Sequence, residues 1–176
     1  MAGIDENASF IPVQIAILTV SDTRGEHEDT SGAALVERAE RAGHKVVRRG
    51  IVPDDQSTIE FKFREWIDDP EVDVIISTGG TGVTGRDVTP EALHAVCEKR
   101  IDGFGELFRW ISWKHIGTST IQSRATAGVA RGTFLFALPG STGACKDGWD
   151  EILVHQLDSR FRPCNFVELM PRLREK

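Results

Sequence analysis

Short apolar runs alternate with amphipathic segments along most of the chain. The runs cover residues 13–20 (VQIAILTV), 44–52, 72–76 (VDVII) and 134–138 (FLFAL). Near-continuous apolar stretches of this length are typical of strands that are covered on both faces. Between the runs, apolar side chains recur at helical spacing, as at Ile59, Phe63 and Trp66. The alternation predicts an α/β fold, a three-layer α/β/α sandwich with a mostly parallel sheet.

Polar residues mark the expected ends of the helices. Thr30 or Ser31 would cap the N-terminus of the first helix, and Thr89 that of a later one, because their hydroxyls accept hydrogen bonds from first-turn N–H groups. A last long helix is predicted from about residue 141 to 160. A short helix near residues 165–173 would follow it.

One further helix, near residues 104–113, is apolar on almost all sides. One side of the helix carries an apolar stripe made of Phe104, Leu107, Phe108 and Ile111. The other side carries Trp110 and Trp113. A helix that is apolar on all sides is expected to be buried. Because the chain is short, burial of this helix at a contact with another subunit is favoured.

Composition and charge narrow the class of protein. The 176 residues are 40% hydrophobic and 27% charged, which suits one globular domain over residues 11–176. Residues 1–10 carry no export signal and are interpreted as a flexible N-terminal tail, so a cytoplasmic location is expected. The net charge of −6 and the lack of a long apolar run predict no nucleic-acid partner and no membrane. The three cysteines are expected to be buried, reduced thiols.

Small, acidic or turn-forming residues follow each predicted strand. They are Ser21 and Asp22, Pro53 and Asp54, the glycine-rich segment 77–85, and Pro139 with Gly140. Ligands of open α/β sheets bind at the carboxyl ends of the strands. The four loops therefore indicate one binding site.

The glycine-rich segment admits three interpretations. Gly80, Gly82 and Gly85 fit the G-x-G-x-x-G dinucleotide fingerprint, and Gly80 with Gly85 has the spacing of a Walker A loop. We reject the fingerprint because the helix is expected to begin only after the glycines. We reject the Walker loop because Arg86 and Asp87 stand where Lys and Ser or Thr belong. A flexible strand-to-helix turn without function is the third interpretation.

Asp54 and Asp87 are candidate metal ligands near strand ends. If the strands are neighbours, both carboxylates can point into one crevice, where paired hard oxygen ligands suit Mg²⁺ carrying nucleotide phosphates. Alternatively, Asp54 only begins a turn, and Asp55 caps the helix that follows. Asp87 would then only interact with the positive end of a helix dipole. For Asp54, the local sequence by itself favours a turn over a metal ligand.

The segment TGGTG…RDVTPEA at residues 78–92 resembles the signature of the molybdopterin-binding fold. Other similar stretches are AILTVSD (16–22), GFGE (103–106), IGTSTIQSRA (116–125) and ALPGST (137–142), and the resemblance extends from residue 11 to about 166. The family is that of molybdenum cofactor biosynthesis protein B and molybdopterin adenylyltransferase. DTSG (29–32), GTSTIQSRA (117–125) and RPCNF (162–166) resemble the protein B branch.

The resemblance implies a catalytic role for Asp54 and Asp87, in place of the turn. Some members of the protein B branch lack these acids; here both would hold Mg²⁺ as cofactor. The implied substrates are molybdopterin and ATP: the terminal phosphate of molybdopterin attacks the α-phosphate of ATP, and pyrophosphate leaves. Loop N–H groups would bind anions, and Ser123 would hold the pterin phosphate. The implied substrate-binding residues are Ser21, Asp22, Thr78, Gly79, Gly80, Thr81, Gly82, Ser123, Pro139, Gly140 and Ser141.

Other activities and partners remain open at this stage. Family members form homotrimers or homohexamers, which the face with Trp110 and Trp113 suits, and other proteins of the molybdenum cofactor pathway are further expected partners. The main alternative is a non-catalytic carrier that binds molybdopterin; an oligomeric scaffold with a vestigial site is another. If the rejected dinucleotide fingerprint applied, the protein would be an oxidoreductase that binds NAD. Glu106 is either structural or part of the pocket.

Overall fold

The computed structural model describes residues 2–23 and 25–175, so Arg24 of the predicted polar loop lies outside the described residues. The strands are β1 (Gly3–Ile4), β2 (Gln14–Val20), β3 (Lys45–Val52), β4 (Val74–Thr78), β5 (Lys99–Arg100), β6 (Thr126–Ala130), β7 (Thr133–Leu138) and β8 (Phe161–Arg162). The α-helices are α1 (Thr30–Arg41), α2 (Gln56–Ile67), α3 (Thr89–Val96), α4 (Asp102–Ile116), α5 (Thr142–Gly148), α6 (Val154–Gln156) and α7 (Phe166–Leu169). Shorter helical turns are η1 (Glu26–Glu28), η2 (Gly117–Gln122), the π-helical η3 (Trp149–Leu153) and η4 (Met170–Arg172).

The central sheet has the strand order β3-β2-β4-β7-β6-β5. Strands β3, β2, β4 and β7 run parallel, whereas β6 and β5 are antiparallel to their neighbours. Thr19 of β2 lies opposite Thr78 of β4, and Thr78 lies opposite Leu138 of β7. These three strands therefore end at the same level, and their loops leave the sheet from one edge.

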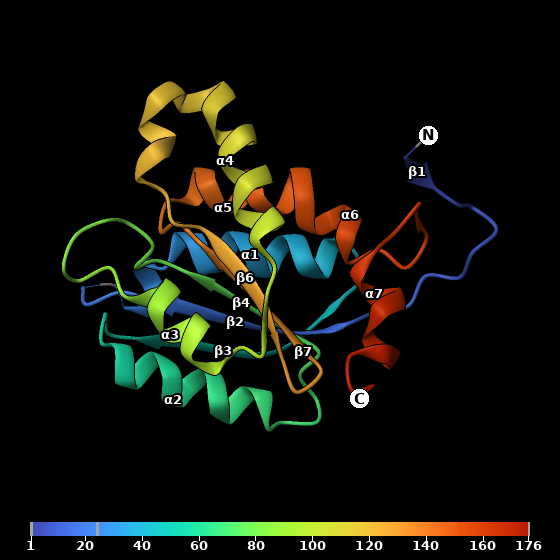
Figure 1. The fold of residues 1–176 in the computed structure, drawn as a ribbon, viewed down its shortest axis with the longest axis horizontal. Helices are drawn as coiled ribbons and strands as arrows, with labels where there is room; N and C mark the ends of the chain where they lie inside the picture. The colour runs from blue at the N-terminus through green and yellow to red at the C-terminus, as the bar shows by residue number, and fades with distance from the viewer. Residues whose placement is uncertain (1, 24, 176) are drawn as a thin grey trace.

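Helices cover both faces of the sheet (Figure 1). Successive side chains of a strand point to opposite faces. Ile15 and Ile17 of β2 therefore pack in a core with α1, α4, α5 and η3, and Ala16 and Leu18 pack in a second core with α2 and α3. Burial on both faces explains why the run is apolar without alternation. The predicted three-layer α/β/α sandwich with a mostly parallel sheet is confirmed.

All four predicted strands are present, with ends shifted by one or two residues. Strands β5 and β6 of the central sheet, and the short strands β1 and β8, were not predicted from the sequence. Strand β6 has the sequence TAGVA, and all five of its residues are buried. Its side chains are mostly small, so they leave little apolar signal, and only packing against β7, α3 and α4 identifies it as a strand.

Both N-cap predictions are wrong. Asp29, rather than Thr30 or Ser31, caps α1, and its carboxylate accepts a backbone N–H of the first turn at 2.8 Å. A carboxylate caps as well as a hydroxyl does. Helix α3 is preceded by Val88, which offers no capping side chain, and Thr89 is the first helical residue.

Both ends of the chain differ in part from expectation. The last long helix, formed by α5, η3 and α6, ends at Gln156 instead of near Arg160. Asp158 ends the helical run by accepting the backbone N–H of Arg160 at 2.9 Å. The predicted short helix is present as α7 and η4. Strand β1 pairs antiparallel with β8, so part of the N-terminal segment joins a two-stranded sheet. The flexibility of that segment and the domain boundaries stay predictions.

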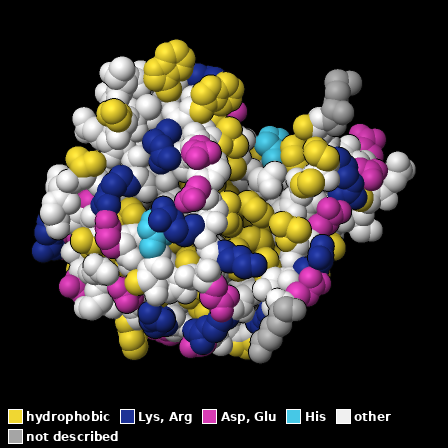
Figure 2. Space-filling model, in the orientation of Figure 1, with side chains coloured by type: hydrophobic (Ala, Val, Ile, Leu, Met, Phe, Trp, Pro, Cys, Tyr) yellow, Lys and Arg dark blue, Asp and Glu magenta, His cyan; other side chains and the backbone are white. Residues whose placement is uncertain are grey.

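Helix α4 projects beyond the sheet with one face exposed (Figure 1). Phe104 and Phe108 are buried, as predicted, but Leu107 of the same stripe is 42% exposed. Trp110 and Trp113 are 59% and 58% exposed. Figure 2 shows hydrophobic side chains gathered on the surface at this end of the molecule. Exposed apolar patches mark contact surfaces, and the subunit interface stays a prediction.

The cysteines do not share one environment. Cys145 is buried as predicted, Cys97 is partly buried, and Cys164 is exposed, which corrects the expectation for that residue. Burial and the nearby Glu98 raise the pKa of Cys97 to about 12, so its thiol is neutral and unreactive at ordinary pH. Within residues 2–23 and 25–175, no helix combines the length and apolar character that a membrane crossing needs.

Candidate functional site

The glycine-rich loop lies against two other loops of the carboxyl edge. Gly79 has φ 106° and sits so close to β2 that a Cβ would lie 2.1 Å from the carbonyl oxygen of Val20. Its N–H donates to the carbonyl of Leu138 at 3.0 Å. A Cβ on Gly140 would lie 3.3 Å from Gly79 Cα. Such close backbone approaches need glycine, and they bring together the ends of β2, β4 and β7.

A cavity of about 220 Å³ lies between these loops, η2 and α4. Six of the predicted substrate-binding residues are among its lining: Thr81, Gly82, Ser123, Pro139, Gly140 and Ser141. Phe108 and Ile116 of α4 contribute an apolar wall. The volume is below the roughly 300–1,000 Å³ of pockets that enclose a whole small molecule, so the cavity suits one end of a larger ligand.

Asp54 follows β3 and lies beside Asp22 and Gly80. Its backbone N–H donates to Asp22 Oδ1 at 3.0 Å, and a Cβ on Gly80 would lie 2.9 Å from Asp54 Oδ1. Burial raises the pKa of Asp54, and the negative charges of Asp22 and Asp87 raise it further. Three carboxylates thus repel one another in this loop cluster, and a cation would relieve that repulsion.

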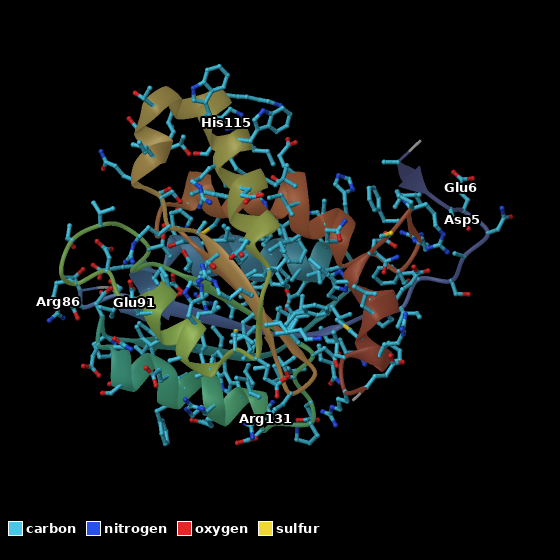
Figure 3. The ribbon with its side chains drawn as sticks, in the orientation of Figure 1. Asp5, Glu6, Arg86, Glu91, His115 and Arg131 are labelled. Atoms are coloured by element: carbon cyan, nitrogen blue, oxygen red, sulfur yellow. The ribbon has the colours of Figure 1, made fainter. Side chains whose placement is uncertain are left out.

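Arg86 closes the outer side of the cluster by pairing with Asp22. Its hydrogen bond lowers the pKa of Asp22, with a further contribution from the N–H of Asp54. Figure 3 shows Arg86 at the outer end of the loop that precedes α3, where Glu91 lies. The Arg86 and Asp22 side chains are 68% and 37% exposed, so the pair contributes little stability and can open when a ligand enters.

The carboxylate of Asp87 is turned back into its own loop. Asp87 Oδ2 accepts the backbone N–H of Thr84 at 2.9 Å and the Thr84 hydroxyl at 2.7 Å. The backbone N–H of Gly82 also lowers the pKa of this carboxylate. Burial raises the pKa of Asp87, but these hydrogen bonds together outweigh burial and leave the pKa lowered. Asp87 is therefore an ionised carboxylate held against Gly82, two residues from the glycine that Asp54 contacts.

Other predicted binding residues also have structural contacts. The buried Thr78 donates its hydroxyl to the carbonyl of Pro139 at 2.9 Å and contacts the Cys145 sulfur at 3.0 Å. Ser141 caps α5 by accepting a backbone N–H at 3.2 Å. Ser21 Oγ accepts a backbone N–H within its loop at 3.3 Å. These contacts hold the loops in place, and the ligand-binding roles of the three residues stay predictions.

Thr89 has an unusual environment that the sequence analysis did not anticipate. Its Oγ1 is buried and has no hydrogen-bond partner within the described residues. A Cβ on Gly80 would lie 2.4 Å from this oxygen, so the hydroxyl is directed at the glycine-rich loop beside Asp54. An unsatisfied buried hydroxyl costs about 1–3 kcal/mol, and because Thr89 is 0% exposed, its hydroxyl faces the inner side of the glycine-rich loop. The sequence offered no sign of this, since Thr89 resembled an ordinary N-cap.

A second cleft of about 620 Å³ lies between α3 and α4. Its lining includes Glu106, whose role the sequence left open, and Arg109. Ser123 lines both this cleft and the smaller cavity, and Arg124 lies beside it. Arg124 is a site residue that sequence reasoning missed. It belongs to the QSRA stretch, but contacts of a guanidinium with backbone carbonyls leave no pattern in a sequence.

The acidic residues limit which metal the site could hold. In the part of the chain that the structure describes, no group of three or more His, Cys, Asp or Glu is arranged around a metal position. Zinc sites need three or four protein ligands. Mg²⁺ binds through one or two carboxylates together with substrate phosphates and water. The pair Asp54 and Asp87 fits the second arrangement.

Comparisons with known proteins agree with this architecture. Residues 16–159 match the family model described as "Probable molybdopterin binding domain". Molybdenum cofactor biosynthesis protein B of Escherichia coli (strain K12) is 51% identical over 160 residues, which cover 91% of this chain and 94% of that protein. The protein of the same name from Bacillus cereus is 43% identical over 146 residues, covering 82% and 86%.

Solved structures show the same similarity. A crystal structure of molybdenum cofactor biosynthesis protein B has a TM-score of 0.86 and 37% identity, covering 96% of this chain and 100% of that one. The tungsten cofactor synthesizing protein MoaB from Pyrococcus furiosus has a TM-score of 0.78 and 34% identity, covering 93% and 98%.

The fold and the loop cluster define an α/β protein with a mostly parallel sheet and a cavity at the carboxyl edge of that sheet. The chain belongs to the family of molybdopterin-binding domains that includes molybdenum cofactor biosynthesis protein B. Its role therefore lies in molybdenum cofactor biosynthesis, and the resemblance drawn from the sequence motifs is confirmed.

Proposed function

We propose that this protein binds molybdopterin and adenylylates it with Mg-ATP. The terminal phosphate oxygen of molybdopterin forms a bond to the α-phosphorus of ATP, and the bond from that phosphorus to the β-phosphate oxygen breaks. The products are adenylylated molybdopterin and pyrophosphate. The observation that carries the proposal is the placement of Asp54 against Gly80 and Asp87 against Gly82, within one glycine-rich segment.

The residues present fit a magnesium ion. Asp54 and Asp87 offer hard oxygen ligands, and a bound cation would counteract the burial and the negative charges of Asp22 and Asp87 that together raise the pKa of Asp54. When bound, Mg²⁺ would draw negative charge from the leaving pyrophosphate and align the phosphates. The hydrogen bonds to Asp87 from Thr84 and Gly82 keep that carboxylate ionised in a fixed position.

The remaining site residues would bind and orient the two substrates. The 220 Å³ cavity would take the phosphate-bearing end of molybdopterin, and Ser123, which lies in its wall, would donate to that phosphate. The glycine-rich loop contributes backbone N–H groups, although those of Gly79 and Gly82 already donate within the protein. The turn Pro139-Gly140-Ser141 closes the opposite wall.

The experiment mixes purified protein with molybdopterin and Mg-ATP and measures pyrophosphate release together with the mass of the adenylylated pterin. We expect product from the wild type, and at least a hundredfold less from Asp87→Asn and Asp54→Asn, since each loses a charged ligand. Asp150→Asn is the matched control, because Asp150 is an exposed partner of Arg38 outside the site. Binding of the pterin without product would refute the enzyme and support the non-catalytic carrier.

We also propose that the chain assembles with itself through the exposed face of α4 and η2. Large exposed hydrophobic side chains support this: Leu107, Trp110, Trp113, Ile116 and Ile121. Contiguous apolar surface of this kind is unusual on a monomer and frequent at subunit contacts. A homotrimer or homohexamer would remove this surface from water. Sedimentation of the purified protein measures the assembly directly.

A further inference from the structure

Arg124 holds the glycine-rich loop by three backbone carbonyls. Its Nε donates to the carbonyl of Gly82 at 2.6 Å, and its Nη2 to the carbonyl of Asp87 at 2.5 Å. Its own backbone N–H donates to the carbonyl of Thr81 at 2.9 Å. The remaining nitrogen, Nη1, pairs with Glu91 of α3.

These contacts close the loop into one unit. The guanidinium is a rigid planar fork, so two of its nitrogens can bridge the carbonyls at the two ends of the turn from Gly82 to Asp87. Inside that turn, the Asp87 N–H donates to the carbonyl of Thr84 at 3.1 Å, and Thr84 donates back to the Asp87 carboxylate. Arg124 thus holds the outer side of this turn, and the Asp87 carboxylate occupies its inner side.

One peptide group connects Arg124 directly to that carboxylate. The carbonyl of Thr81 accepts from the Arg124 backbone, and the N–H of the same peptide belongs to Gly82. In a trans peptide, the C=O and N–H point in opposite directions. The Gly82 N–H is therefore turned away from Arg124 and toward the Asp87 carboxylate, whose pKa it lowers.

We propose that Arg124 is a positioning residue, which sets the orientation of the Asp87 carboxylate by clamping the backbone carbonyls of Thr81, Gly82 and Asp87. The clamp is a property of the loop. Its consequence for catalysis rests on the proposed adenylyl transfer. Because Arg124 also lines the second cleft, the clamp connects the wall of that cleft with the glycine-rich loop.

Amide hydrogen exchange of residues 80–88 tests the clamp without any substrate. We expect Arg124→Lys to speed exchange of these amides about tenfold or more, because lysine lacks the rigid planar fork whose Nε and Nη2 each reach one of the two carbonyls. Arg100→Lys is the matched control, since Arg100 lines the same cleft and, among the described residues, pairs with the exposed Asp102 alone, at 3.3 Å. Glu91→Gln, which leaves the carbonyl contacts in place, should change exchange by less than about threefold.

A second uncharged variant, Arg124→Met, guards against an effect of the lysine itself, and urea unfolding confirms that each variant is folded. Unchanged exchange of the loop amides in both Arg124 variants would overturn the proposal. Faster exchange throughout the sheet would also overturn it, because the role would then be general stability. Faster exchange confined to residues 80–88 supports it.

Pyrophosphate release provides the functional readout. We expect Arg124→Lys to raise the half-saturating Mg²⁺ concentration about tenfold, since Asp87 loses its fixed orientation. An effect on kcat at unchanged Mg²⁺ dependence would refute the link to Asp87. If the wild type releases no pyrophosphate, the proposed function fails, while the exchange measurement still decides on the clamp.

Discussion

Replacing Gly79 by alanine tests whether the glycine-rich loop requires its close approach to β2. The residue has φ 106°, a backbone conformation that alanine rarely adopts. The added Cβ would lie 2.1 Å from the carbonyl oxygen of Val20, a backbone atom at the end of a buried strand. No side chain can rotate to relieve this overlap, so the loop or the strand must shift.

The magnitude follows from these two effects. A non-glycine residue in a disfavoured region costs about 1–3 kcal/mol. Forcing extra volume into a packed interior costs about 1–3 kcal/mol more. The free energy of unfolding should therefore fall by about 2–6 kcal/mol, which is a large part of the 5–15 kcal/mol typical of a domain.

Urea unfolding followed by circular dichroism measures this change. Gly85→Ala is the matched control, because Gly85 lies in the same loop and a Cβ there would meet nothing within 4 Å. We expect Gly85→Ala to stay within about 0.5 kcal/mol of the wild type. The reasoning is refuted if the two variants unfold at the same urea concentration, since the contact with Val20 would then carry no cost.

Three further predictions concern other parts of the molecule. Burial lowers the pKa of His44, whose Nδ1 accepts the Val13 N–H. The stability that the neutral ring supports is therefore present above pH 6.5 and is lost as the pH falls below that value. His44→Gln should reduce the difference in unfolding free energy between pH 7.5 and pH 5.5. An unaltered difference would contradict this. Asp29→Ala should lower the free energy of unfolding, measured in urea, by about 2–4 kcal/mol, because the change removes the cap of α1 and the buried partner of Arg49. A loss as small as that of a surface substitution would contradict this prediction. Trp110→Glu should lower the sedimenting mass if the exposed face of α4 joins subunits, and an unchanged mass would exclude that face.

Predictions of structure from the sequence succeeded where a local pattern decides the outcome. The apolar run of β2 has to be covered on both faces, which is why the layered α/β fold could be inferred before any coordinates. The expectation that Asp55 caps a helix is confirmed: its carboxylate accepts the Thr58 N–H at 2.8 Å, and the hydrogen bonds from Thr58 and Ser57 lower its pKa to about 2. Rejecting the dinucleotide fingerprint also holds, since α3 begins at Thr89, after the glycines.

The errors occurred where two local signals compete or where no local signal exists. Asp29 and Thr30 can both cap a helix, and the outcome depends on burial of the carboxylate beside Thr19 and Arg49, which come from other elements. The small residues of β6 are compatible with a loop until β7 and α4 pack against them. The signal is absent in the second case, because small side chains carry little hydrophobic periodicity.

By itself, the sequence determined the layered fold and the family, since each depends on residue types at short spacing. Only the tertiary structure showed that Asp54 and Asp87 approach the same glycine segment, that the Thr89 hydroxyl is buried without a partner, and that Arg124 clamps the loop. The physical reason is distance along the chain. Arg124 donates to a carbonyl 42 residues away, and a hydrogen bond to the backbone does not depend on the side chain of the residue that accepts it.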